Sequence, residues 1–120
     1  MDEKEILNQF GEMFINKVRN YVLWQMDNIF SGELNSEEAK NLHAKLRHFF
    51  PEDMEIIKEI STEAVDRALF ETMSMFDTSE DFIIGAIKDE EIINLTDISD
   101  GLEGEYDEWI ENYSEPNNEE

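Results

Sequence analysis

The fold is decided by residues 3–32, which read EKEILNQFGEMFINKVRNYVLWQMDNIFSG. Apolar side chains recur in this stretch at steps of three, four or eight residues, the spacing that gathers them on one face of a helix. They are Leu7, Phe10, Phe14, Val18, Tyr21 and Ile29. The spacing therefore predicts one long helix over residues 3–30, stopped by Ser31 and Gly32.

The second half of this helix has a different composition from the first. Residues 21–26, YVLWQM, are apolar almost all the way round. A helix that is apolar on every side is buried on every side or covered by a partner. We therefore expect this half to lie at the centre of the core. The expected core consists of Phe14, Val18, Tyr21, Val22, Leu46, Ile60, Ala64 and Ala68.

Two further helices are predicted over residues 35–50 and 51–76. Asn35 is a suitable N-cap for the first, and Glu38 stands three residues later, where it closes a capping box. Pro51 ends that helix and suits the first turn of the next one. Because the links are short, we expect the three helices to pack as neighbouring antiparallel rods.

The pattern changes after residue 79. Residues 82–87 and 91–96 are short, rich in isoleucine and separated by Lys88, Asp89 and Glu90. This predicts a β-hairpin with a three-residue turn, and a continuation of helix is the alternative. Because an isolated hairpin is marginal in water, its apolar side must lie on the helices.

A final helix follows, with Asp100 as its expected cap and Glu103 at its third position. Its apolar stripe consists of Leu102, Tyr106, Trp109, Ile110 and Tyr113. The predicted fold is mainly α, an α+β arrangement with a small hairpin: three long helices, a C-terminal β-hairpin and a final amphipathic acidic helix. We expect a single helical domain over residues 1–113 and a flexible acidic tail over residues 114–120.

The composition is strongly acidic but still that of a folded protein. The 120 residues include 31 acidic and 9 basic side chains, for a net charge of −22. Hydrophobic residues make up 40%, with eight Phe, three Tyr and two Trp, enough for a packed core and against disorder. The length is typical of one domain, and the absence of cysteine indicates a reducing compartment.

The charge also excludes classes of partner. Nucleic acid and anionic membranes would both repel a chain of this charge, so we expect neither to bind directly. The N-terminal residues 1–5, MDEKE, do not resemble a basic signal peptide, and the apolar run 82–87 is far shorter than a membrane span. These features predict a cytoplasmic location.

No catalytic or metal-binding motif is recognisable. His43 and His48 are five residues apart, which separates them on a helix, so no metal site is expected. Residues 96–107 do not place acids at the ligand positions of a calcium-binding loop. Nucleotide-binding loops and nucleophile motifs are missing too, so we expect no catalytic residues, no cofactor and no enzyme activity.

The negative charge is concentrated near the C-terminus. Residues 1–76 contain 15 acids and eight bases, whereas residues 77–120 contain 16 acids and one base, Lys88. In the last helix Glu103, Asp107 and Glu111 form one like-charged row, each pair of which disfavours the helix by about 0.2–0.5 kcal/mol. Acids interleaved with aromatic residues are typical of an interface for a basic partner, although a solvated face would have the same sequence.

The predicted partner-binding residues lie in and just before this helix. They are Asp97, Asp100, Glu103, Glu105, Asp107, Glu108, Trp109 and Glu111. We expect an acidic inhibitor that neutralises a basic protein, in the manner of a bacterial immunity protein or antitoxin against a nuclease-type toxin, whose active site must be basic to hold phosphates. The alternatives are a helical structural or regulatory subunit acting by self-association, and a nucleic-acid mimic. The oligomeric state, monomer or dimer, stays open.

Overall fold

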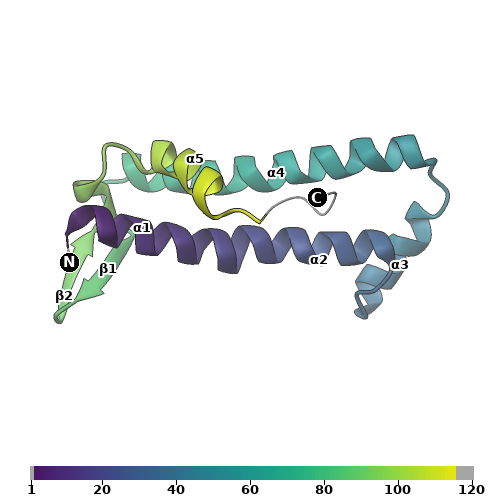
Figure 1. Ribbon diagram of the computed structural model, residues 1–120, viewed down its shortest axis with the longest axis horizontal. Helices are drawn as coiled ribbons and strands as arrows, with labels where there is room; N and C mark the ends of the chain where they lie inside the picture. The colour runs from purple at the N-terminus through teal and green to yellow at the C-terminus, as the bar shows by residue number, and fades with distance from the viewer. Residues whose placement is uncertain (1, 116–120) are drawn as a thin grey trace.

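The computed structural model describes residues 2–115 and confirms a mainly helical fold with a small antiparallel hairpin (Figure 1). Two long antiparallel rods lie side by side and give the molecule its elongated shape, with extents of 52 × 32 × 24 Å. Within the described residues, no helix combines the length and the apolar character needed to cross a membrane.

The first rod is continuous, as predicted, and contains α1 (Glu3–Phe14), the π-helical turn η1 (Ile15–Arg19) and α2 (Asn20–Ser31). The side chain of Asp2 caps its start by accepting a hydrogen bond from the backbone N–H of Glu5 at 2.8 Å. Gly32, in the left-handed conformation with φ of 83°, ends it.

The π turn explains why the expected core was wrong for this rod. The backbone N–H of Asn20 donates to the carbonyl of Ile15, five residues back, so this turn contains more residues than an α-helical turn. The buried face therefore passes through Ile15 and Arg19, while Val18 is only half-buried. Tyr21 turns outward and is 53% exposed.

The next helices are α3 (Glu37–Leu46) and α4 (Pro51–Thr78). Ser36, rather than the predicted Asn35, caps α3, because its Oγ accepts the backbone N–H of Ala39 at 3.2 Å. Figure 1 shows α3 as a short helix at the end of the molecule where α2 ends and α4 begins, so the prediction of three neighbouring rods is corrected to two rods and a short helix that contacts α2.

The core lies at the opposite end, where α1, the C-terminal half of α4, the hairpin and the last helix meet. Its buried residues are Ile6, Leu7, Ile15, Met73, Leu95, Leu102, Tyr106 and Trp109. The expected core was largely wrong: Ile60 is 64% exposed, and Ala64 and Ala68 are exposed as well. Of the rest, Phe14, Val18, Val22 and Leu46 are half-buried.

The hairpin pairs β1 (Gly85–Lys88) with β2 (Glu91–Asn94), so the helical alternative is wrong. The strands are shorter than predicted, and the turn contains two residues instead of three. Asp89 and Glu90 form it with φ of 51° and 68°, the left-handed pattern of a type I′ turn.

The chain continues through the short 3₁₀ turn η2 (Leu95–Ile98) into α5 (Leu102–Tyr113). The predicted cap Asp100 is wrong, because the capping carboxylate comes from α4. The backbone N–H groups of Leu102 and Glu103 donate to the two carboxylate oxygens of Asp77 at 3.0 and 3.2 Å. Long-range packing of α4 against α5 thus replaces the local cap that the sequence offers.

Candidate partner-binding surface

Helix α5 presents its apolar stripe to the core and its acids to the outside. Leu102, Tyr106 and Trp109 are buried, and the ring of Phe10 meets the Trp109 indole edge-on with 5.5 Å between centroids. A Cβ on Gly11 would overlap the same indole ring, so α1 approaches α5 closely only because residue 11 is glycine. Since Trp109 is 1% exposed, its predicted contact with a partner is wrong for this structure.

A polar cluster under α5 holds the helix in one orientation. The guanidinium of Arg19 donates to both carboxylate oxygens of Asp66, at 2.6 and 3.0 Å, and the hydroxyl of Tyr106 donates to Asp66 Oδ1 at 2.9 Å. The hydrogen bond to Asp66 raises the pKa of Arg19. Burial raises the pKa of Tyr106, and its bond to Asp66 adds to the effect. The cluster joins η1, α4 and α5.

The C-terminal end of α5 is anchored by a buried side chain of the first rod. The amide Nδ2 of Asn20 donates to the carbonyl of Tyr113 at 3.2 Å, and its Oδ1 accepts the backbone N–H of Glu115 at 3.3 Å. The expected tail therefore begins with an ordered contact at residues 114–115, and the rest of it, residues 116–120, lies outside the described residues. Both ends of α5 are thus attached to the long rods.

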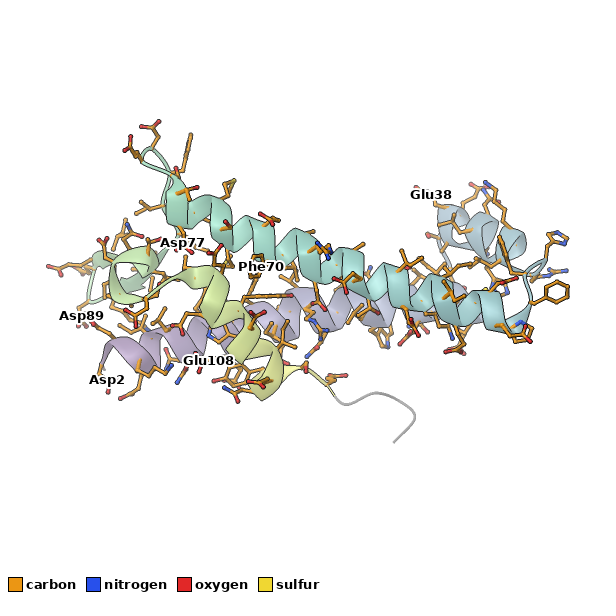
Figure 2. The ribbon with its side chains drawn as sticks, turned by 90° about the horizontal axis from the view of Figure 1, so that it is seen from above. Asp2, Glu38, Phe70, Asp77, Asp89 and Glu108 are labelled. Carbon is orange, nitrogen blue, oxygen red and sulfur yellow. The ribbon has the colours of Figure 1, made fainter. Side chains whose placement is uncertain are left out.

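The predicted acids follow one another along a single segment of the chain. Asp97 and Asp100 are exposed in the connection before α5, and Asp107, Glu108 and Glu111 are exposed on α5 itself. Glu103 and Glu105 are half-buried at its start. Figure 2 shows Glu108 in the same half of the molecule as Asp77 and Asp89, with Glu38 at the far end. The acids therefore share one end of the structure.

The position of Glu105 at the start of α5 changes the pKa of its carboxyl group. Burial raises its pKa, and the neighbouring carboxylates of Glu108 and Asp100 raise it further. Lys4 of α1 opposes this rise, with its Nζ 3.9 Å from Glu105 Oε1. The ionised form of Glu105 is therefore disfavoured in the isolated protein. A cation bound near this carboxylate would stabilise the ionised form.

Searches of family models, curated proteins and solved structures give no match to this chain. Its function is therefore inferred from its own geometry. Within residues 2–115, no three histidine or carboxylate side chains are arranged to hold a metal ion.

Sequence reasoning missed two exposed apolar features. Tyr21 and Trp24 stack on the outside of α2, with ring centroids 5.8 Å apart. Ile83, Ile87 and Ile92 are exposed on and beside the hairpin. The alternation of side chains along a strand could have identified the isoleucines, but only once the two-residue turn had set the pairing register.

Proposed function

We propose that this protein binds and blocks a basic protein through the exposed carboxylates of α5 and of the segment before it. The observation that supports this proposal is the arrangement of acids along residues 97–111, on a helix attached at both ends. Because Asp77 and Asn20 hold those ends, the acids are positioned before a partner arrives. Binding then costs little ordering of the backbone.

Electrostatics would serve this function in two ways. A surface of one charge sign steers an oppositely charged partner and speeds association, an effect that falls as salt is added. A bound cation would also oppose the burial and the neighbouring carboxylates that together raise the pKa of Glu105. The specific form of the proposal is a bacterial immunity protein or antitoxin whose target is a nuclease-type toxin with a basic active site.

A pair of charge variants tests this proposal. Asp107→Asn, Glu108→Gln and Glu111→Gln together remove three exposed charges from α5. The matched control removes three exposed charges from α4 with Glu55→Gln, Glu59→Gln and Glu71→Gln.

Each protein is immobilised and exposed to an extract of the source cell at low salt. The expected partner is retained by the wild type and by the α4 control, is lost with the α5 variant and is released by high salt. Its association rate with the wild type should then fall about tenfold or more as salt is raised. An association rate independent of salt would contradict the proposal.

Two further assays separate the forms of the inhibitor. If the retained protein cleaves nucleic acid and the wild-type chain stops that cleavage, the toxin form is supported. If the chain instead displaces DNA from many unrelated DNA-binding proteins, the nucleic-acid mimic is supported and a dedicated partner is not.

Self-association is the second candidate, and the far half of the molecule favours it. Residues 20–70 carry ten acids and five bases, against 21 acids and four bases in the rest of the chain. Large apolar side chains are exposed in that half: Leu42, Phe49, Phe50, Ile56 and Ile60. Sedimentation equilibrium of the protein alone tests this candidate, and a monomer at micromolar concentration would remove it.

A further inference from the structure

The hairpin has two faces, and only one of them is covered. Strand register pairs Ala86 with Ile93, and both pack against the core. It also pairs Ile87 with Ile92, and these side chains are 75% and 68% exposed. Ile83 lies just before β1, where the backbone N–H of Leu95 donates to the carbonyl of Ile84 at 2.9 Å and the Ile84 side chain packs against the core; Ile83 itself is 54% exposed.

These three exposed isoleucines are called here the isoleucine face, and two of them, Ile87 and Ile92, are direct cross-strand neighbours. Gly85 lies between Ile83 and Ile87 in the chain, and a Cβ on it would come within 2.9 Å of Ile92 Cγ2. The side chain of Ile92 therefore extends across the strand into the space that Gly85 leaves open. An exposed apolar surface of this kind on a charged protein marks an interaction site.

Exposed acids stand at both ends of the isoleucine face. Glu80 and Asp81 precede it in the chain and the turn carries Asp89 and Glu90, whereas Glu91 pairs with Lys88 on the other side of the hairpin. Figure 2 shows Asp89 at the same end of the molecule as Asp2, with Glu38 at the opposite end.

The one base of this region is on the other side of the hairpin. Lys88 alternates with Ile87, so its side chain lies on the inner side, where its Nζ donates to Gln9 Oε1 of α1 at 3.2 Å. Lys88 is the one basic residue among residues 80–97. Because its side chain lies on the inner side, this segment places no positive charge on the outer side of the hairpin.

We propose that the isoleucine face is the apolar centre of a docking surface for a basic protein partner. This inference rests on the proposed function. It adds to that function the apolar side chains that would be removed from water when the partner binds. Specific interfaces combine a buried apolar centre with a polar rim, and the few residues at that centre supply most of the binding energy. Here the charged residues of the rim are all acids, and a partner with lysines or arginines around an apolar patch complements them.

Charge complementarity favours that occupant over a second copy of the chain. In a two-fold dimer the same patch meets itself, so the four flanking acids of one copy would come close to the four of the other. The C-terminal residues 116–120, PNNEE, contain two acids and no large apolar side chain, so their composition does not complement an apolar face with acids around it.

Two synthetic peptides of equal length and charge test the proposal. One alternates lysine with valine and presents an apolar face, and the other alternates lysine with serine. Their affinities for the full chain are measured by calorimetry. The wild type should bind the lysine–valine peptide about tenfold more tightly, which corresponds to about 1.4 kcal/mol of apolar burial.

Matched isoleucine variants show which surface of the protein causes the difference in affinity between the two peptides. Ile87→Thr with Ile92→Thr keeps the β-branched shape that strands favour and should abolish the preference for the lysine–valine peptide. Ile56→Thr with Ile60→Thr changes two exposed isoleucines of α4, at 54% and 64% exposure, and should keep the preference. Circular dichroism and thermal unfolding confirm that each variant is folded, and Ile87→Thr alone replaces the double variant if the hairpin is lost.

The outcomes separate this inference from the proposed function. If the hairpin variant keeps the preference while neutralising α5 weakens binding of both peptides, the inference is wrong and the proposed function stands. If the hairpin variant loses the preference while neutralising α5 changes nothing, the isoleucine face is supported and the role of α5 is wrong. If the wild type is a dimer and Ile87→Thr with Ile92→Thr makes it a monomer, a second copy occupies the face and the inference is overturned.

Discussion

The two ends of the molecule differ in how many layers they contain. At the end with the core, α5 and the hairpin cover α1 and the C-terminal half of α4, so aromatic side chains such as Trp109 are removed from water. At the other end, α3 is the one further element beside α2 and the N-terminal half of α4 among residues 2–115, and Trp24 and Ile60 stay exposed. Two paired helices cannot bury more than the strip between them, so the third layer decides which apolar residues form a core.

This contrast predicts unequal stability along the rods, because local unfolding begins where few apolar contacts are buried. The C-terminal half of α2 and the N-terminal half of α4 should therefore exchange their amide hydrogens faster than α1 and the C-terminal half of α4. The substitutions below test the contrast at individual residues.

The two tryptophans give the largest expected difference. Trp109→Ala empties the centre of the core and should lower the free energy of unfolding by about 3–5 kcal/mol. Trp24→Ala, at a side chain that is 55% exposed, should change it by less than about 0.5 kcal/mol. Urea denaturation followed by circular dichroism measures both, and equal losses would contradict the layered description.

Two glycines provide the next comparison. Gly11→Ala places a methyl group against the Trp109 indole and should cost about 1–3 kcal/mol. Gly104→Ala, on the outside of α5 with no atom within 4 Å of the added carbon, should stabilise the protein by about 0.5–1 kcal/mol. Denaturation midpoints with opposite shifts confirm the prediction, whereas shifts of the same sign would show that α1 and α5 are not this close.

Asp77 should matter more than the acid that local sequence offers as a cap. Asp77→Ala leaves two backbone N–H groups of α5 without an acceptor and should lower the free energy of unfolding by about 1 kcal/mol. Asp100→Ala should have little effect, since the structure gives Asp100 no capping bond to α5. A larger loss from Asp100→Ala than from Asp77→Ala in thermal unfolding would reverse this assignment.

The smallest expected effect concerns pH. Because folding raises the pKa of Glu105, the folded state holds this proton more tightly than the unfolded state. The resulting stabilisation is present below the ordinary glutamate pKa and is lost as pH rises through the raised value. Glu105→Gln should therefore be at least as stable as the wild type at neutral pH and should lose less stability between acid and neutral pH. If the free energy of unfolding changes with pH in the same way for the wild type and for Glu105→Gln, the raised pKa of Glu105 is contradicted.

The limits of prediction are clearest in the first rod and the last helix. The spacing from Leu7 to Phe14 predicted the rod correctly, but the π turn at residues 15–19 rotated Tyr21 outward, and no periodic pattern signals such a turn. The stripe containing Trp109 predicted α5 correctly. Its aromatic residues, expected at an interface, are needed to complete the core.

The sequence by itself determined the local elements and the place of the charge. Each of these signals can be recognised within a short stretch of sequence. They are the spacing of apolar residues in the helices, Pro51 at a helix boundary, the two short isoleucine segments of the hairpin and the acids of residues 77–120. Only the tertiary structure decided which face of α4 is buried, that Asp77 caps α5, and that the isoleucine face stays exposed. These outcomes depend on contacts between residues far apart in the chain, where several apolar stripes compete for one core and only the one covered by a third layer is buried.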